Sequence, residues 1–273
     1  MSLYRAQPGD GVAWVTGAST GIGRSLARDL VAEGYTVAVT ARDEERLATL
    51  VDEIAGLPGR ILLFPCDVTD EDGMLKTVAA IEAEAGPIVL AIFNAGAYFP
   101  TRGERMDVQN FARTYELNIL GALYGLIPLV ARMQPRGRGH IALMGSVTAY
   151  FGLPSAAAYG SSKAALNNLA ESLKFDFDKM NIRLQIINPG FVETPLTEKK
   201  SFPMPGIMPA DRASARIARG LRTGGFEVAF PRRFTLFLKV LKLFPHAVYF
   251  WFMNWATGWR KRPLGPMRKL RKD

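Results

Sequence analysis

The stretch GVAWVTGASTGIG, residues 11–23, decides the fold of this chain. Its first six residues form a short apolar run, and three glycines follow with the spacing Gly17-x3-Gly21-x-Gly23. Apolar residues then recur at helical spacing over 24–33. Glycines between a strand and a helix let the backbone approach a pyrophosphate, whose charge the helix N-terminus meets. The stretch therefore predicts a strand–turn–helix unit that binds a nucleotide; the alternative is a tight turn without a ligand.

The same alternation of apolar runs and helical segments continues along the chain. Further apolar runs occur at 35–40, 60–64, 88–93, 139–144, 182–188 and 226–230. Helical spacing separates them, at 43–54, 70–85, 107–134 (one long or two consecutive helices), 155–180 and 211–222. Continuously apolar runs are typical of parallel strands that are covered on both faces. The pattern predicts an α/β fold, a doubly wound parallel sheet of about seven strands (Rossmann fold), with a loop or short helices over 191–210.

Composition and charge bound the classes of function. The 273 residues are 48% hydrophobic and 22% charged, which predicts one α/β domain over 1–230 with a helical tail over 231–273. The net charge of +9 belongs to the tail, which holds 11 Lys and Arg against one acid, whereas the rest holds 23 basic and 24 acidic residues. A neutral body argues against a nucleic-acid partner. The single Cys66 and the absence of an apolar signal segment favour a cytoplasmic protein, and two histidines give no case for a metal site.

A second stretch, GSVTAYFGLPSAAAYGSSKAA at 145–165, holds the candidate catalytic residues. Tyr159 and Lys163 lie four positions apart among good helix formers, so they share one helix face. A phenol titrates near ~10, and a nearby ammonium favours the phenolate; lowering that pKa to about 7 takes roughly 4 kcal/mol. Ser146 follows an apolar run on a turn, where it can hold a substrate oxygen. The alternative is a packed tyrosine beside a solvated lysine.

The end of the second strand indicates which dinucleotide is bound. A carboxylate there would accept hydrogen bonds from a ribose diol and repel a 2′-phosphate. Here the strand ends in Thr40-Ala41-Arg42, and Asp43 is expected to cap the next helix. The guanidinium of Arg42 can pair with a 2′-phosphate. This favours NADP(H) over NAD(H); the alternative is a solvated arginine.

Taken together, these residues closely resemble the short-chain dehydrogenase/reductase family. The matching pieces occur in the family's order and spacing over about residues 10–230: TGASTGIG at 16–23, Cys66-Asp67-Val68, Asn94-Ala95-Gly96, Asn118, Ser146, Tyr159-x3-Lys163, Pro189-Gly190 and Thr194. Phe93 stands where many members have a second asparagine, which leaves the motif itself intact. No catalytic position is substituted, so the resemblance implies an active enzyme.

The resemblance implies a role for each matching position. Tyr159 would be the general acid/base, and Lys163 would bind the nicotinamide ribose and lower the tyrosine pKa. Ser146 would orient the substrate oxygen, and Asn118 would hold a water that relays protons. The remaining cofactor-binding positions would be Gly17, Ser19, Thr20, Gly21, Ile22 and Gly23 at the pyrophosphate, Asp67 and Val68 at the adenine, Asn94, Ala95 and Gly96 on the ribose side, and Pro189, Gly190, Val192 and Thr194 near the nicotinamide.

These features predict an oxidoreductase that moves a hydride between NADP(H) and a carbonyl or alcohol. Two other hypotheses stay open: a dinucleotide-binding redox sensor or scaffold at a membrane surface, and an epimerase or dehydratase on the same fold. Apolar residues near the site would suit a lipophilic substrate: Phe191, Phe202, Met204, Ile207 and Met208. The family often assembles through helices near 107–134 and 155–178, so a homodimer or homotetramer is expected.

The tail is both apolar and basic. Residues 234–244 fall on a helix with Thr235, Lys239 and Lys242 on a narrow polar stripe, and tryptophans recur every four residues at 251, 255 and 259. Wide apolar faces with flanking cations are typical of helices on an anionic leaflet, which predicts peripheral membrane contact through 232–262 at the inner face of a membrane. Two alternatives stay open: helices packed on the domain or on a second subunit, and a membrane span over the 17 uncharged residues 243–259.

Overall fold

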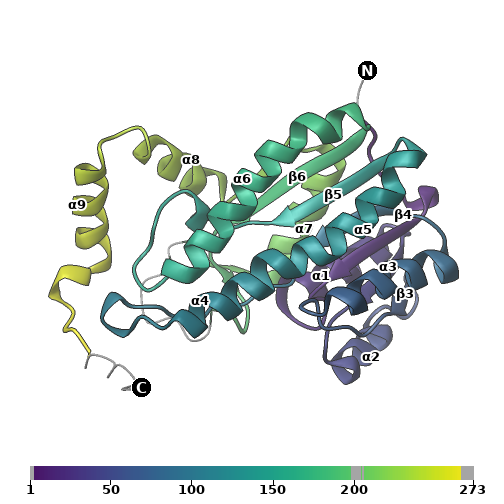
Figure 1. Cartoon of the computed structure of the whole chain (residues 1–273), viewed down its shortest axis with the longest axis horizontal. Helices are drawn as coiled ribbons and strands as arrows, with labels where there is room; N and C mark the ends of the chain where they lie inside the picture. Colours follow the sequence, from purple (N-terminus) through teal and green to yellow (C-terminus); the bar gives the residue numbers. More distant parts are fainter. Residues whose placement is uncertain (1–2, 198–203, 205, 266–273) are drawn as a thin grey trace.

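Seven parallel strands form the centre of the protein in the computed structural model, which describes residues 3–197, 204 and 206–265 (Figure 1). Their spatial order is β3-β2-β1-β4-β5-β6-β9. The strands are β1 Val12–Thr16, β2 Thr36–Thr40, β3 Arg60–Leu63, β4 Ile88–Phe93, β5 Gly139–Met144, β6 Ile182–Pro189 and β9 Glu227–Phe230. The order reverses between β1 and β4, and in such sheets the ligand crevice lies outside the carboxyl ends of the strands at that point.

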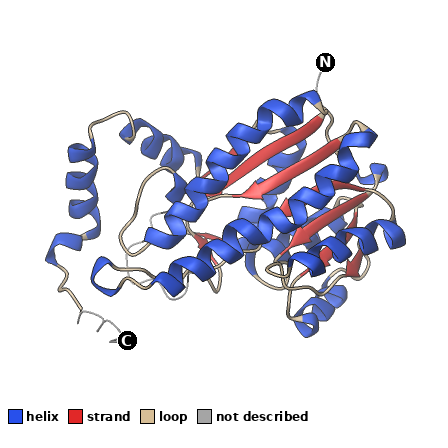
Figure 2. Cartoon of the chain, in the orientation of Figure 1, coloured by secondary structure: helices blue, strands red, loops and turns tan. Residues whose placement is uncertain are grey.

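Helices cover both faces of the sheet, as Figure 2 shows. They are α1 Gly21–Ala32, α2 Glu44–Glu53, α3 Glu71–Ala85, α4 Val108–Tyr115, α5 Gly121–Arg136, α6 Ala157–Lys179, α7 Ala210–Thr223, α8 Arg232–Leu241 and α9 His246–Thr257. Buried side chains of α1, α2 and α7 form one apolar core, and those of α3, α5 and α6 form the other. The predicted doubly wound parallel sheet is confirmed.

The sequence-based expectations describe two segments only loosely. Residues 107–134, expected as one long or two consecutive helices, form α4 and α5, which are joined by one π-helical turn, Glu116–Leu120. The segment 191–210, expected as a loop or short helices, contains two short strands, β7 Val192–Glu193 and β8 Met208–Pro209, which pair as a separate small sheet. Two-residue strands carry too little sequence for a period to be recognised. Phe202, expected beside the site, lies outside the described residues.

One helical stretch, 108–136, is long and apolar enough to cross a membrane by length and composition. One face of α5 is buried in the core through Ala122, Leu126 and Leu129, and α5 packs beside α3 and β4. This packing makes the stretch a helix of the domain.

Helix α8 packs on the domain through one residue of its polar stripe and two leucines. Thr235 is only 4% exposed, and Lys239 forms an ion pair with Glu227 of β9, whereas Leu236 and Val240 are exposed. Leu238 and Leu241 are buried beside Thr235, and Lys239 and Lys242 are exposed. The predicted helix therefore forms and keeps both lysines of its polar stripe at the surface. Beyond it, α9 ends at Thr257, so the third tryptophan of the expected stripe, Trp259, lies in a separate 3-10 turn.

Acid should destabilise the protein through a buried histidine on β5. His140 is 1% exposed with Nε2 2.8 Å from Gln185 Oε1, and burial lowers its pKa to about 3. In the unfolded chain this imidazole titrates near 6.5, so below that pH the unfolded state binds a proton that the folded state does not. The free energy of unfolding therefore decreases as the pH is lowered, by about 2 kcal/mol between pH 7 and pH 5.

Urea unfolding of the wild type and His140→Gln at both pH values measures this effect. The variant should lose about 2 kcal/mol less than the wild type over the interval. His246→Gln, at an exposed position on α9, is the control and should behave like the wild type. Equal losses in the wild type and His140→Gln would contradict the assignment.

Candidate active site

A pocket of about 530 Å³ lies at the carboxyl ends of β1, β4, β5 and β6; we call it the catalytic pocket. Nearly all of the predicted site residues line it. From the turn after β1 and the ends of β2 to β4 come Gly17, Ser19, Thr20, Gly21, Ile22, Arg42, Asp67, Val68, Asn94, Ala95 and Gly96. From β5, α6 and the segment after β6 come Ser146, Tyr159, Lys163, Pro189, Gly190, Val192 and Thr194. The two exceptions are Gly23 and Asn118, which lie behind the pocket wall.

The turn at 17–23, here called the glycine turn, needs its glycines for two reasons. Gly17 and Gly21 have φ of +68° and +55°, and a Cβ on Gly17 would lie 2.8 Å from Ala95 Cα. A Cβ on Gly23 would lie 2.3 Å from the Gly17 carbonyl oxygen, so this glycine lets α1 pack against the turn. The three glycines therefore close the turn tightly against the end of β4.

The N-terminus of α1 faces the catalytic pocket without a side-chain cap. Thr20 occupies the N-cap position and makes no capping hydrogen bond, whereas aspartates cap α2, α3 and α4. The cap of α2 is Asp43, as predicted, with Oδ1 3.0 Å from Arg46 N. The N–H groups of the first turn of α1 are thus left for an anion, which fits a dinucleotide pyrophosphate.

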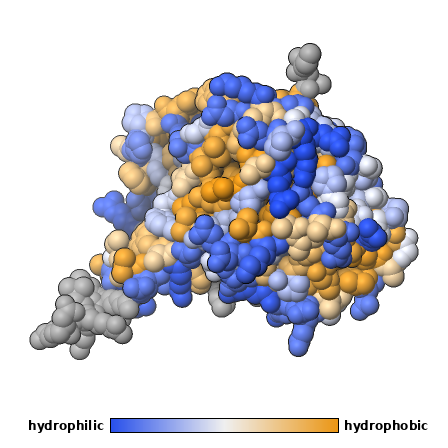
Figure 3. Space-filling model, turned by 45° about the vertical axis from the view of Figure 1, so that its right-hand side comes forward, coloured by the Kyte–Doolittle hydropathy of each residue, from blue (hydrophilic) through white to orange (hydrophobic). Residues whose placement is uncertain are grey.

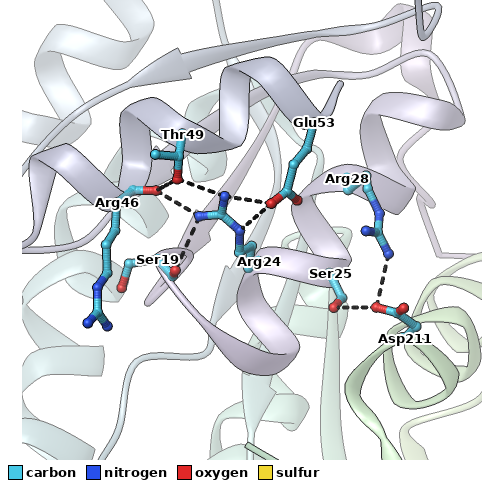
Figure 4. Close-up of polar contacts among 8 residues, drawn as sticks. All are labelled: Ser19, Arg24, Ser25, Arg28, Arg46, Thr49, Glu53 and Asp211. Atoms are coloured by element: carbon cyan, nitrogen blue, oxygen red, sulfur yellow. Dashed lines mark hydrogen bonds and ion pairs between the residues drawn. The ribbon is translucent and has the colours of Figure 1, made fainter. Parts of the chain in front are cut away.

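An arginine that the sequence analysis did not single out fastens the glycine turn to α2 (Figure 4). Arg24 donates to the carbonyl oxygens of Ser19, at 3.3 Å, and Arg46, at 2.7 Å. It also donates to Glu53 Oε1, at 2.7 Å, and to Thr49 Oγ1, at 2.9 Å. This contact sets the spacing between the turn and the cationic end of the pocket.

The cationic end of the catalytic pocket holds two guanidinium groups. Arg42 Nη1 lies 3.6 Å from Asp67 Oδ2, and the Arg42 side chain is 73% exposed. Arg46, which the sequence analysis missed, pairs with Asp43 at 3.1 Å and also lines the pocket. The signal available for it was its place in the first turn of α2, three positions after the cap Asp43. Two cations at one rim suit an anionic group of a ligand.

Asn94 holds the backbone together at the end of β4. Its Nδ2 donates to the carbonyl oxygens of Thr16 and Gly17, at 3.0 and 3.1 Å, and Thr16 Oγ1 accepts from the backbone N–H of Asn94 and Ala95. The Asn94 amide therefore fixes the glycine turn. Asn94 also lines the catalytic pocket, on the side where the ribose is expected.

The three candidate catalytic side chains meet at the inner end of the catalytic pocket. Ser146 follows β5 and caps a 3-10 turn, with its Oγ accepting from Thr148 N at 3.2 Å. Tyr159 and Lys163 lie in the first two turns of α6, and both are buried. Lys163 Nζ donates to the Met144 carbonyl oxygen at 2.7 Å and lies 5.8 Å from the centre of the Tyr159 ring.

Burial has the largest effect on the pKa values of Tyr159 and Lys163. It raises the pKa of Tyr159 to about 12, against the opposing effect of a hydrogen bond with Ser146, and it lowers the pKa of Lys163 to about 8. The predicted lowering combines Lys163 with the positively charged ring of a bound cofactor, and in the protein alone burial sets the direction of the Tyr159 pKa. A bound positive charge near Tyr159 would lower the pKa of its phenol, as predicted.

Asn118 supports the pocket from behind. It lies in the π-helical turn, is 1% exposed, and its Oδ1 accepts from Ala97 N at 2.8 Å. Its Nδ2 donates to the Ala97 carbonyl oxygen at 3.1 Å and to Ser162 Oγ at 3.0 Å. It therefore joins α6 to the segment after β4, which keeps Lys163 beside Gly96.

A buried polar network that sequence reasoning missed positions Ser146. Asn188 Oδ1 accepts from Ser146 N at 2.9 Å, and Asn188 Nδ2 donates to Glu227 Oε1 and Asn167 Oδ1, both at 2.8 Å. Glu227 also pairs with Lys239 of α8, and those contacts lower its pKa against the opposing effect of burial. The only signal was the position of Asn188 directly before Pro189-Gly190.

Comparisons with known proteins agree with this geometry. A family model described as short chain dehydrogenase matches residues 11–203. The chain is 34% identical over 237 residues to an uncharacterized oxidoreductase of Myxococcus xanthus, covering 87% of this chain and 94% of that one. It is also 34% identical over 188 residues to a 3beta-hydroxysteroid dehydrogenase of Mediterraneibacter gnavus, covering 68% of each. A short-chain type dehydrogenase/reductase from Mycobacterium marinum superposes with a TM-score of 0.74 at 26% identity, over 82% of this chain and 94% of that one.

Proposed function

The chain belongs to the short-chain dehydrogenase/reductase family, and from this premise we propose that it is an NADP(H)-dependent oxidoreductase acting on the carbonyl or alcohol group of a lipophilic molecule. One observation carries the proposal. Ser146, Tyr159 and Lys163 line the same pocket as the uncapped start of α1 and the glycine turn. A hydride donor held by the turn and a proton donor from α6 would thus meet in one enclosed space.

The preference for NADP(H) rests on the rim at Arg42. This guanidinium lines the catalytic pocket beside Asp67, the expected adenine contact, and Arg46 adds a second cation. A 2′-phosphate there would gain charge-assisted hydrogen bonds. A ribose diol would find no carboxylate at the end of β2, since Asp43 is occupied by its capping bond and by Arg46.

The residues of the chain would divide the chemistry as follows. When bound, the nicotinamide supplies or accepts the hydride. The hydroxyls of Ser146 and Tyr159 hold the reacting oxygen, and Tyr159 donates its proton to that oxygen in reduction or removes one in oxidation. Their hydrogen bonds strengthen as negative charge grows on the oxygen, which favours the transition state. Lys163 binds the ribose and holds positive charge beside the phenol, and Asn118 keeps Lys163 and the 95–97 segment in register and would hold the relay water.

A lipophilic substrate is supported by apolar side chains in and beside the catalytic pocket. Phe191 lines the pocket and is 5% exposed, and its carbonyl oxygen accepts from the backbone N–H of Met208, a residue that is also 5% exposed. Met204 and Ile207 line a neighbouring pocket that shares Gly21 and Thr194 with the catalytic pocket. The relative from Mediterraneibacter gnavus is named for a steroid substrate, which is consistent with this class.

A panel of ketones and aldehydes with NADPH and NADH side by side tests the proposed function. Oxidation of NADPH that depends on the carbonyl is the expected result. An epimerase or dehydratase would convert substrate with no net loss of cofactor, and a redox sensor or scaffold would bind NADPH without turnover. Either outcome would replace the proposal with the corresponding alternative.

We also propose that the tail contacts the inner face of a membrane, in a protein that works in the cytoplasm; the support is the exposed apolar surface of residues 236–264, here called the tail surface. Of the eighteen large apolar side chains exposed in the described residues, ten lie within 236–264, among them Leu243 at 85% and Trp251 at 69%. Arg232, Arg233 and Lys242 are exposed beside them. Exposed apolar side chains with flanking cations match the two attractions of an anionic leaflet. Helix α9, with 12 residues, is about 18 Å long, too short for a hydrocarbon layer of about 30 Å.

Sedimentation with vesicles measures this contact. The wild type should bind phosphatidylglycerol vesicles, less so in high salt, and the Leu243→Glu/Trp251→Glu double variant should bind at least tenfold more weakly because each side chain contributes about 1.5–3 kcal/mol. Leu75→Glu, at an exposed apolar position on α3, is the matched control and should bind normally. Binding that is identical in the double variant would contradict the membrane contact, and a dimer that the double variant loses would assign the surface to a second copy.

A homodimer or homotetramer is also part of the proposal. Apolar side chains gather between hydrophilic margins on the face seen in Figure 3. Val108 of α4, Ile127 of α5 and Phe175 of α6 are each more than 60% exposed. Burying these side chains against a second subunit would remove them from water.

A further inference from the structure

A second cavity, of about 670 Å³, lies between the tail helices and the domain; we call it the tail chamber. Helices α8 and α9 form one side, and the segment Phe151–Pro154 after β5 contributes to the other. Val147 and Phe191 line both this chamber and the catalytic pocket. Val147 is the residue next to Ser146, so the two cavities adjoin at the point where the substrate oxygen is held.

The walls of the tail chamber are apolar and aromatic. Helix α8 contributes Phe234, Phe237 and Leu238, and α9 contributes Phe252 and Met253. The hydroxyl groups on the walls already have partners. The Tyr249 hydroxyl donates to the Gly152 carbonyl oxygen, and the Thr257 hydroxyl donates to the Met253 carbonyl oxygen at 2.6 Å. These hydroxyl groups therefore offer little to a polar ligand.

Specific contacts hold α9 in place over the chamber. The Tyr249 ring stacks on Phe151 with centres 4.2 Å apart and an interplanar angle of 11°. At the far end of the helix the Arg102 guanidinium lies 5.1 Å from the centre of the Trp259 ring, and Arg102 Nη2 donates to the Pro263 carbonyl oxygen at 2.9 Å. Both ends of α9 therefore contact loops of the domain, and these contacts fix the position of the helix over the chamber.

We propose that the tail chamber binds the hydrocarbon body of the substrate, while its carbonyl or carbinol reaches Ser146 and Tyr159. The inference rests on the proposed oxidoreductase function and names its substrate class: molecules with a reactive oxygen and an apolar body of about ten or more carbons, since cavities of roughly 300–1,000 Å³ hold ligands of this size. It also gives the tail a role in the site itself, because α8 and α9 become walls of the substrate pocket.

The shape of the joined cavities supports this assignment over a small substrate. A short carbonyl compound would contact Ser146 and Tyr159 but leave the chamber beyond Val147 and Phe191 unfilled. Each methylene that enters an apolar cavity is expected to strengthen binding about fourfold. Selection by chain length therefore follows from the cavity and needs no further polar contact.

A ketone series with NADPH tests the proposal in the full-length protein. In linear 2-alkanones from four to sixteen carbons, kcat/KM should rise about fourfold per methylene until the chamber is filled. A fused-ring keto steroid forms a second arm. A preference for the linear ketones assigns the chamber to a flexible chain, and a preference for the steroid assigns it to a rigid body.

Two variants of α9 locate the effect. Ala256→Phe adds a ring to the chamber wall, and Ala247→Phe adds the same ring nine positions earlier, on the opposite side of the helix. Ala256→Phe should lower kcat/KM at least tenfold for the long ketones or the steroid and leave the four-carbon ketone unchanged. Ala247→Phe should change neither.

Quenching of tryptophan fluorescence by bromododecane, which has no carbonyl, separates this proposal from the proposed function. Trp255 and Trp259 line the chamber, so quenching should saturate in the wild type and weaken in Ala256→Phe. Saturable quenching without turnover of any carbonyl would uphold the chamber and overturn the oxidoreductase function. Turnover with equal kcat/KM for all chain lengths and for the steroid would uphold the function and overturn the chamber.

Discussion

Replacing Tyr159 with phenylalanine should lower kcat/KM by about a thousandfold, while NADPH binds as in the wild type. The phenol lines the catalytic pocket beside Ser146 and is the proposed proton donor, and general acid–base catalysis by one group contributes roughly 10²–10⁴-fold. Phenylalanine keeps the ring and its edge-on contact with Tyr98, whose centre is 5.5 Å away. The fold around the site should therefore remain, and only the hydroxyl is lost.

Steady-state kinetics and a fluorescence titration with NADPH measure the two halves of this expectation. Tyr98→Phe is the matched control, because its hydroxyl donates to the Ser155 carbonyl oxygen at 3.2 Å and the variant also loses one phenolic hydroxyl. It should retain activity within a few-fold. Turnover in Tyr159→Phe close to that of the wild type would show that another group moves the proton.

Replacing Arg42 with serine should raise the KM for NADPH by about ten- to a hundredfold and leave that for NADH almost unchanged. A hydrogen bond to a charged group contributes about 1.5–3 kcal/mol, and the tenfold interval is about 1.4 kcal/mol. Only NADPH carries the 2′-phosphate that this guanidinium would pair with. Serine also removes the cation that lies 3.6 Å from Asp67. The Asp67 carboxylate then loses its ion pair, and serine supplies no cation for a 2′-phosphate.

The ratio of kcat/KM for the two cofactors, compared across the wild type, Arg42→Ser and Arg46→Ser, measures the contribution of each guanidinium. Arg46 is held by Asp43 and should contribute less. An equal loss with NADPH and NADH in Arg42→Ser would mean that Arg42 supports the pocket and does not distinguish the cofactors.

The sheet could be predicted because its determinants are local. The strands are mostly apolar runs, such as VAWVT in β1 and IVLAIF in β4, and residues such as Gly17 and Gly21 lie where a positive φ closes the turn. The cap of α2 is also local, because Asp43 accepts a hydrogen bond from the backbone N–H of Arg46, only three positions later. The clustering of Ser146, Tyr159 and Lys163 in one pocket follows from parallel strands that end at one edge.

Other features depend on contacts between distant segments, and no local pattern encodes them. The hydrogen bonds from Asn188 to Glu227 and Asn167 join residues that lie 39 and 21 positions away. The ion pair of Lys239 with the partly buried Glu227 joins α8 to β9, and the pattern of an isolated helix does not encode it. The high pKa of Tyr159 comes from burial, which only the packed structure determines.

The most direct test of hydride transfer uses NADPH deuterated in turn on each face of the nicotinamide ring, with the ketone that gives the highest kcat/KM. Mass spectrometry of the alcohol product should find one deuterium at the carbinol carbon from one labelled form and none from the other. The same product should be lost in Tyr159→Phe. Product without deuterium from either form, or product formed while NADPH is not consumed, would contradict an oxidoreductase function for this protein.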